Sequence, residues 1–291
     1  MNASKTIGIV GCGTMGTGIA IVAARAGFKT RIYDLKPEPL ENARKQAAAF
    51  LKKSVERGKL AAGEDAQIMA QFLTTTDAKE FADCDLVIEA VFEDLKVKHS
   101  IFKQLNDICP AHTIFASNTS TISITEIAGG SGRADRFVGM HFCLPAQLMK
   151  LVEMSPGMNT SDATFEAAWK LCEALGQKPV RTRDTPGFIL NYFLIPFNND
   201  VINLIDQGVA DAVNIDLAVK TALGYPLGPL ELLDMVGMDT QLLLCDAMHG
   251  LTNEARAACP PLVKRMIGAG RLGRKTGQGF HTYDSSKIFG A

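Results

Sequence analysis

Two polar residues that could move a proton bound the segment HFCLPAQLMKLVE, residues 141–153. His141 and Glu153 stand twelve positions apart, with mostly apolar residues and Pro145 between them. Because an imidazole titrates near neutral pH, His141 could serve as a general base. If the chain turns at Pro145, Glu153 could hold the other ring nitrogen, fix the tautomer and stabilise the imidazolium. Spacing alone slightly favours a structural alternative, in which a backbone carbonyl satisfies a core histidine and Glu153 lies on the surface.

The elements that would position these residues follow an alternating pattern. Over the first 185 residues, short apolar runs alternate with amphipathic stretches, which predicts a mostly parallel sheet with helices on both faces. Predicted strands cover residues 6–11, 30–34, 85–91, 113–117, 136–142 and 151–154, and predicted helices cover 15–26, 38–57 and 64–71. Ligands of such a sheet bind beyond the carboxyl ends of its strands. His141 lies near one of these ends, and Asn118 and Ser120 follow another, so we expect all three at one edge.

The sequence GCGTMG places glycines in GxGxxG spacing between a predicted strand and a predicted helix. Gly11 would allow the tight turn, Gly13 the approach of a pyrophosphate, and Gly16 the close packing of the helix. The helix N-terminus, which Thr14 and Met15 open, would direct unpaired N–H groups and a positive dipole end at the phosphates. This context predicts a dinucleotide site in a Rossmann-type domain.

Asp34 ends the second predicted strand, 18 residues after Gly16. A carboxylate there could accept hydrogen bonds from both ribose hydroxyls and would repel a 2′-phosphate, which favours NAD over NADP. Lys36 nearby weakens that preference slightly. The structural alternative is a glycine turn followed by an ordinary surface aspartate.

The pattern changes near RDTPGF, residues 183–188. Asp184 or Thr185 is expected to cap a helix, with Pro186 in its first turn. That predicted helix, residues 187–205, is apolar nearly all round, which predicts burial within its own domain or against another subunit. The chain then looks helical through about residue 267. We therefore predict a Rossmann-like NAD-binding domain over 1–185, with a helical insertion near 38–71, and an all-α domain over 186–291.

Charge and composition exclude several classes of partner and location. The net charge of −1 indicates neither nucleic acid nor an anionic membrane as a partner. Seven cysteines, an odd number without CxxC spacing, predict neither a disulfide framework nor a metal site, and favour a reducing compartment such as the cytoplasm. The N-terminal residues show no signal segment. The longest apolar run, near 188–197, is too short and too polar to span a bilayer.

A basic stripe and one amide remain as candidate ligand contacts. Lys45, Lys52 and Lys59 fall seven apart and would share one helix face if the helix continued past Gly58. A phosphate-rich ligand could dock there, although the pattern alone favours a solvated face. Asn191, the first polar residue of the apolar helix, could reach a cleft between domains or be a satisfied buried amide.

Several motifs together resemble those of the NAD-dependent 3-hydroxyacyl-CoA dehydrogenases, most closely the short 3-hydroxybutyryl-CoA dehydrogenase type. The resemblance covers nearly all 291 residues. It runs through GCGTMGTGIA (11–20), EAVFEDLKVK (89–98), FASNTS (115–120), HFCLPAQLMKLVE (141–153), RDTPGFILN (183–191), LGYPLGPLELLDMVGMDT (223–240) and GRKTGQGF (273–280).

The resemblance implies roles for individual residues. The family's catalytic histidine and glutamate match His141 and Glu153, and its substrate-contacting serine and asparagine match Ser120 and Asn191. Its cofactor contacts match the loop from Gly11 to Gly16 together with Asp34, Glu93, Lys98 and Asn118. Contacts to coenzyme A would fall among Lys52, Lys53 and Lys59. The resemblance also implies an acyl-CoA substrate, fatty acid metabolism such as beta-oxidation, and a homodimer formed by the C-terminal helical domain.

This chain departs from the family pattern at three positions. HFCLP stands where the family usually has HFFNP, so Cys143 replaces a phenylalanine and Leu144 an asparagine. Tyr192 replaces the arginine that usually follows the substrate asparagine. Loop geometry, substrate preference or rate could therefore differ.

Two other functions remain open on the sequence. A same-fold dehydrogenase of a free hydroxy acid, such as carnitine or a sugar acid, would keep His141 and Glu153 but need no basic phosphate site. A non-catalytic NAD-binding protein, structural or redox-sensing, would not need the combination of Ser120, His141, Glu153 and Asn191.

Overall fold

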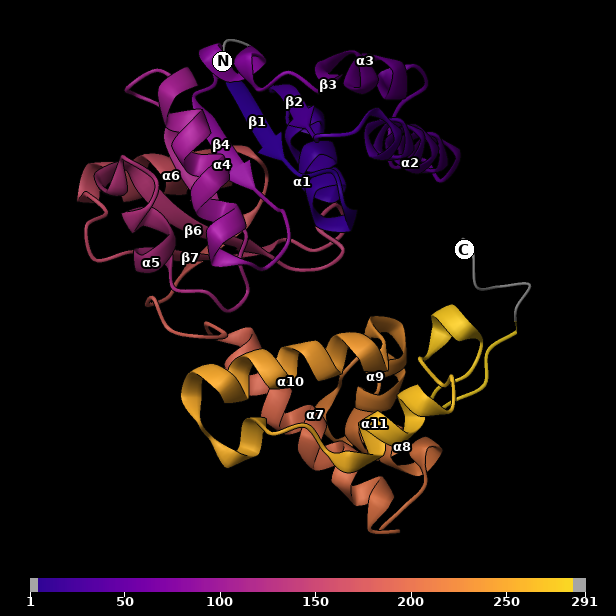
Figure 1. The fold of residues 1–291 in the computed structure, drawn as a ribbon. Helices are drawn as coiled ribbons and strands as arrows, with labels where there is room; N and C mark the ends of the chain where they lie inside the picture. The colour runs from indigo at the N-terminus through magenta and orange to yellow at the C-terminus, as the bar shows by residue number, and fades with distance from the viewer. Residues whose placement is uncertain (1–4, 285–291) are drawn as a thin grey trace. The chain divides into compact units, whose positions relative to one another are not determined.

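The computed structural model describes residues 5–284, which fall into two compact units divided between Phe188 and Ile189 (Figure 1). The first four residues, part of the N-terminal stretch without a signal pattern, lie outside the described residues. None of the helices within residues 5–284 combines the length and the apolar character that a membrane span requires.

The first unit is built on a doubly wound sheet. Its described strands are β1 (Thr6–Val10), β2 (Lys29–Tyr33), β3 (Phe72–Thr75), β4 (Leu86–Glu89), β5 (Ile114–Ser117), β6 (Phe137–Phe142), β7 (Leu151–Pro156) and β8 (Lys178–Arg181). They lie in the order β3-β2-β1-β4-β5-β6-β7-β8, and only the β6–β7 pair is antiparallel. Because the strand order reverses direction between β1 and β4, a ligand crevice is expected beyond their carboxyl ends.

Helices cover both faces of this sheet. They are α1 (Thr14–Arg25), α2 (Pro37–Glu56), α3 (Glu64–Gln71), α4 (Leu95–Ile108), α5 (Ile124–Gly129) and α6 (Asp162–Ala174). Alternate strand residues feed two separate cores, as the period of two in a strand requires. Ile7 and Ile9 belong to one core together with residues of α1, α2 and α6, whereas Val10 belongs to the other core with Phe102 of α4 and residues of α5. The predicted α/β sheet with helices on both faces is confirmed.

The second unit is helical, with α7 (Leu190–Asp206), α8 (Ala212–Leu223), α9 (Pro229–Val236), α10 (Met238–Thr252) and α11 (Pro261–Gly268). Its main core gathers apolar residues of all these helices, among them Ile202, Leu230 and Val263. The predicted all-α character of this part of the chain is likewise confirmed.

The segment that joins the units differs from the expectation. The helix begins at Leu190, not after Asp184, and residues 185–188 form a turn closed by the Phe188 N–H donating to the Thr185 carbonyl at 3.1 Å. The Asp184 carboxylate instead accepts hydrogen bonds from Ser123 Oγ and from the backbone N–H groups of Ile124 and Thr125, at 2.7–2.9 Å. Asp184 therefore caps α5, a helix 60 residues earlier in the chain.

The lysine stripe on α2 stops before Lys59. Helix α2 ends at Glu56, and Gly58 adopts a φ of +67°, a left-handed conformation that stops the helix. Lys59 therefore lies beyond the helix, while Lys45, Lys52 and Lys53 remain on it and are exposed. Because the helix does not continue past Gly58, Lys59 does not share a helix face with Lys45 and Lys52.

Candidate active site and dinucleotide site

His141 and Glu153 are direct partners across the antiparallel pair β6–β7. Residues 145–149 turn the chain between the two strands, with the N–H groups of Leu148 and Met149 donating to the Pro145 carbonyl. His141 Nδ1 lies 2.8 Å from Glu153 Oε2, and their side chains are 10% and 1% exposed. Because a carboxylate can only accept, this contact places a proton on Nδ1. In the neutral imidazole, Nε2 then carries a free lone pair, as a general base requires.

Ser120 lies on the other side of the imidazole, with its Oγ 3.2 Å from His141 Nε2. The loop that carries it follows β5 and is held by Glu93. Glu93 Oε1 accepts hydrogen bonds from Thr119 Oγ1, from Ser120 N at 2.9 Å and from Thr121 N at 3.2 Å. Glu93 therefore determines the position of the serine that faces His141.

Lys98 belongs to a buried ionic cluster beneath this loop. Its Nζ lies 2.7 Å from Glu89 Oε1 and 3.1 Å from Glu93 Oε2, and the Lys98 and Glu89 side chains are 1% and 0% exposed. Ser117 Oγ donates to the second Glu89 oxygen at 2.6 Å. A buried charge without its partner is strongly destabilising, so each member of this cluster holds the others in place. The cluster connects α4 to the ends of β4 and β5.

The pKa of Glu93 lies below its ordinary value. Burial pushes it upward, but the Lys98 ammonium and the hydrogen bonds from Thr119 and Ser120 outweigh that effect. A carboxyl with a lowered pKa in the folded state stabilises the fold above its unfolded pKa, near 4.5, and loses that contribution as the pH falls through the folded value.

We therefore expect Glu93→Gln to lower the free energy of unfolding at pH 7 by about 1–2 kcal/mol, since the carboxylate is partly screened by solvent. Below pH 4.5 the difference from the wild type should shrink. Urea unfolding at several pH values measures it, with Glu166→Gln, at an exposed position on α6, as the matched control. A pH-independent difference would contradict a charged role for Glu93.

Phe188 is a neighbour of His141 that the sequence reasoning missed. Its ring centroid lies 5.5 Å from that of the imidazole, and its side chain is 5% exposed. Its φ is +49°, an uncommon conformation for a bulky residue. The ring shields one side of His141 from water. A bare sequence carries no signal for this contact, because nothing in PGF predicts which strand the phenylalanine will reach.

Two of the three departures from the family pattern, Cys143 and Leu144, lie directly after β6. Cys143 is half-buried, and burial, with a smaller effect of Glu153, raises the pKa of its thiol to about 11. It is therefore a neutral thiol near physiological pH. Leu144 is 48% exposed. An exposed apolar side chain thus stands where the family usually supplies an amide.

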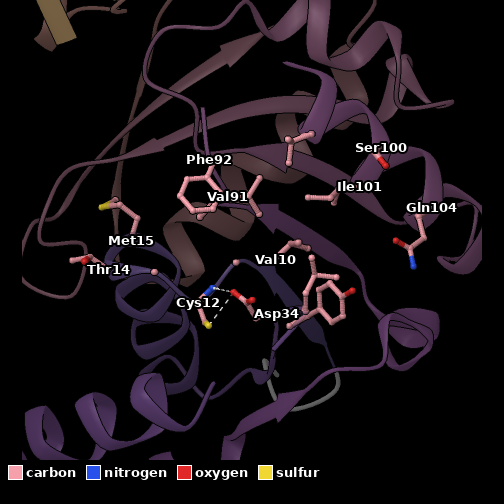
Figure 2. A pocket seen from close by; sticks show the side chains of 16 residues that line it. Val10, Cys12, Thr14, Met15, Asp34, Val91, Phe92, Ser100, Ile101 and Gln104 are labelled. Carbon is pink, nitrogen blue, oxygen red and sulfur yellow. Dashed lines mark hydrogen bonds between the residues drawn. The ribbon is translucent and has the colours of Figure 1, made fainter. Parts of the chain in front are cut away.

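A pocket of about 610 Å³ opens at the carboxyl ends of β1, β2 and β4, where the strand order reverses (Figure 2). Five predicted cofactor residues line it, namely Gly11, Gly13, Thr14, Met15 and Asp34. One part of the pocket lining is apolar and consists of Leu35, Val91, Phe92, Val97 and Ile101. The polar residues Ser100 and Gln104 also line the pocket. Gly16, Glu93, Lys98 and Asn118 lie outside this lining.

The glycine loop fits a dinucleotide on structural grounds. A side chain on Gly16 would collide with the Gly11 carbonyl, and one on Gly11, whose φ is +91°, would come within 2.7 Å of the Ala90 carbonyl oxygen. At Gly13, by contrast, a Cβ would meet nothing within 4 Å, so open space lies over the loop. Helix α1 starts there without an acidic residue in its first turn, which suits an anionic phosphate.

The remaining predicted site residues are placed as follows. Asn118 Oδ1 accepts a hydrogen bond from Phe142 N at 2.8 Å and so ties the end of β5 to the strand of His141. Lys52, Lys53 and Lys59 are exposed. Asn191 is half-buried at the second position of α7, in the other unit. The structure thus brings Ser120, His141 and Glu153 together within the first unit.

Comparison with known proteins identifies the family. Residues 6–185 match the NAD binding domain of 3-hydroxyacyl-CoA dehydrogenase, and residues 187–283 match its C-terminal domain. The chain belongs to the 3-hydroxyacyl-CoA dehydrogenase family. The NAD-binding match also confirms NAD as the cofactor, as the Gly11–Gly16 loop and Asp34 predicted.

Relatives span nearly the whole chain. A probable 3-hydroxybutyryl-CoA dehydrogenase from Deinococcus radiodurans is 41% identical over 276 residues, covering 95% of this chain and 99% of that protein. The mitochondrial hydroxyacyl-coenzyme A dehydrogenase of Homo sapiens is 40% identical, covering 96% and 91%. The crystal structure of (S)-3-hydroxybutyryl-CoA dehydrogenase PaaH1 from Ralstonia eutropha matches with a TM-score of 0.90 and 37% identity, covering 97% and 99%.

Proposed function

We propose that this member of the 3-hydroxyacyl-CoA dehydrogenase family interconverts (S)-3-hydroxyacyl-CoA and 3-ketoacyl-CoA, with short acyl chains such as 3-hydroxybutyryl-CoA as substrates. The observation that supports this most is the buried His141, bonded to Glu153 at Nδ1 and facing Ser120 at Nε2. The names of the Deinococcus radiodurans and Ralstonia eutropha relatives support the short acyl chain.

In the oxidation direction, the bound NAD supplies the acceptor for the hydride that leaves C3 of the substrate. His141 Nε2 takes the proton of the 3-hydroxyl group. Glu153 keeps the other ring proton on Nδ1 and stabilises the imidazolium as it forms. Ser120, held by Glu93, donates a hydrogen bond to the substrate oxygen and fixes its distance from the base.

In the reverse direction, the protonated His141 returns the proton to the 3-keto oxygen. Asn191 would help to position the substrate oxygens with a further hydrogen bond. We propose that acyl-CoA binding draws the two units together. Such closure would exclude water from the path of the hydride.

We propose distinct roles for the other predicted contact residues. The Gly11–Gly16 loop holds the pyrophosphate and Asp34 the ribose. Glu93, Lys98 and Asn118 act at the nicotinamide side, where their hydrogen bonds already fix the Ser120 loop and β6. Coenzyme A phosphates would meet the exposed Lys52, Lys53 or Lys59. Lys45 on α2, whose ammonium lies 2.6 Å from the Glu41 carboxylate, is the control position for substitutions of these three lysines.

We further propose a homodimer formed by the domain that begins at residue 186. Large apolar side chains support this, since Val209, Val213, Leu217 and Leu223 on or just before α8 are each more than half exposed. Seven free thiols support a reducing location, for which the cytoplasm is our proposal.

A panel of substrates tests the proposed activity. Acetoacetyl-CoA should be reduced with NADH, and the rate should fall with longer 3-ketoacyl-CoAs. Free acetoacetate, carnitine-type hydroxy acids and sugar acids should show rates at least about 10²-fold lower, because they lack the binding energy of the coenzyme A moiety. Turnover of a free acid in preference to its thioester would favour the hydroxy-acid alternative. Absence of any turnover would favour a non-catalytic NAD-binding protein.

A further inference from the structure

Asp34 has two partners inside the dinucleotide pocket, and both belong to Cys12. The backbone N–H of Cys12 donates to Asp34 Oδ2 at 3.1 Å, and Cys12 Sγ lies 3.1 Å from the same oxygen (Figure 2). Within residues 5–284, no hydrogen bond to Asp34 Oδ1 accompanies them. One carboxylate oxygen is thus turned toward the glycine loop, and the other remains available.

The Cys12 thiol is suited to remain a hydrogen-bond donor to the Asp34 carboxylate. A carboxylate oxygen only accepts, so the Sγ–H must point at Oδ2. Burial, with the hydrogen bond to Asp34 and its negative charge adding to the effect, raises the pKa of the Cys12 thiol to about 12. Cys12 is 6% exposed. Near physiological pH the thiol therefore keeps its proton and its bond to Asp34.

We propose that Cys12 is a positioning residue for NAD, which holds the Asp34 carboxylate so that Oδ1 faces the adenosine ribose. Two donors on one oxygen restrict rotation of the carboxylate before the cofactor arrives, which lowers the ordering cost of binding. The same restriction keeps a negative charge where the 2′-phosphate of NADP would lie. Cys12 thereby contributes to the preference for NAD. The inference rests on the dinucleotide site of the proposed function and is independent of the acyl substrate.

NADH binding to variants of Cys12 tests the proposal without any acyl substrate. Cys12→Ala, which removes the donor, should raise the Kd for NADH about 3- to 10-fold, the range expected for one weak hydrogen bond to a charged group. Cys12→Ser restores a donor and should lie within about 2-fold of the wild type. Binding of NADPH should change less than that of NADH. Cys172→Ala, which removes a fully buried thiol from α6, is the matched control.

A double-mutant cycle with Asp34→Ala separates positioning from packing. In that background the Cys12→Ala substitution should change the NADH Kd by less than about 2-fold, since the acceptor of the thiol is gone. Alkylation of Cys12 by iodoacetamide should be faster in Asp34→Ala than in the wild type, because two of the causes that raise the pKa of the Cys12 thiol depend on Asp34.

Three results would overturn the inference. The first is equal weakening of NADH binding in Cys12→Ala and Cys12→Ser. The second is equal loss of NADH and NADPH binding in Cys12→Ala. The third is a Cys12→Ala effect that persists in Asp34→Ala. Each would assign to Cys12 a packing role alone. A chain that binds NADH as expected but turns over no acyl-CoA would refute the proposed function and leave this inference standing.

Discussion

Replacement of His141 with glutamine should lower turnover of acetoacetyl-CoA by about 10²- to 10⁴-fold, the usual contribution of a positioned general acid or base. The glutamine amide can still bond to Glu153, but it supplies no group that exchanges a proton near neutral pH. The loss should appear in kcat. NADH binding should stay within a factor of about two, because His141 lies outside the lining of the dinucleotide pocket.

Steady-state assays with NADH and acetoacetyl-CoA measure this effect, and NADH titration checks that the cofactor site is intact. His112→Gln is the matched control, since its side chain is 62% exposed and has no place in the site. Turnover within about 10-fold of the wild type would exclude His141 as the group that transfers the proton.

Glu153→Gln should lower kcat by a similar factor, roughly 10²- to 10⁴-fold, for a different reason. The carboxylate fixes the proton of the imidazole on Nδ1. An amide N–H in its place can donate to Nδ1, which would move the ring proton to Nε2. The nitrogen that faces Ser120 and the substrate would then lack its lone pair.

The expected distinction from a folding defect is a kcat loss with a nearly unchanged Kd for NADH and a native circular dichroism spectrum. Glu166→Gln on α6 provides the control for the same change of residue type. If Glu153→Gln retained nearly full kcat, the His141–Glu153 hydrogen bond would be a structural contact without a part in proton transfer.

The dinucleotide site was predictable because its chemistry is local. The turn, the phosphate approach and the helix packing fall within GCGTMG, and the acidic residue follows at the end of the next strand. The spacing of His141 and Glu153, by contrast, could not show whether the two side chains meet. Whether residues 143–150 return the chain in register is a property of the turn, and a shift of one residue would place Glu153 on the other face.

The contacts made by three residues could not be predicted from the sequence, for related reasons. Asp184 has the residue type of a helix cap, but its type cannot show that it caps α5 instead of the helix that follows it. Lys98 lies on an amphipathic helix, where a lysine is ordinarily exposed, yet it is buried against Glu89. Cys12 occupies a position of the glycine motif that the motif leaves open. Each contact depends on segments brought together only by the sheet.

Deuterium transfer from NADH tests the central claim most directly. NADH labelled with deuterium at both positions of nicotinamide C4 would be incubated with the wild-type chain and acetoacetyl-CoA, and the product analysed by mass spectrometry and chiral chromatography. We predict (S)-3-hydroxybutyryl-CoA that carries one deuterium at C3. A product without deuterium at C3, or of the opposite configuration, would contradict the assignment of this chain as an (S)-3-hydroxyacyl-CoA dehydrogenase.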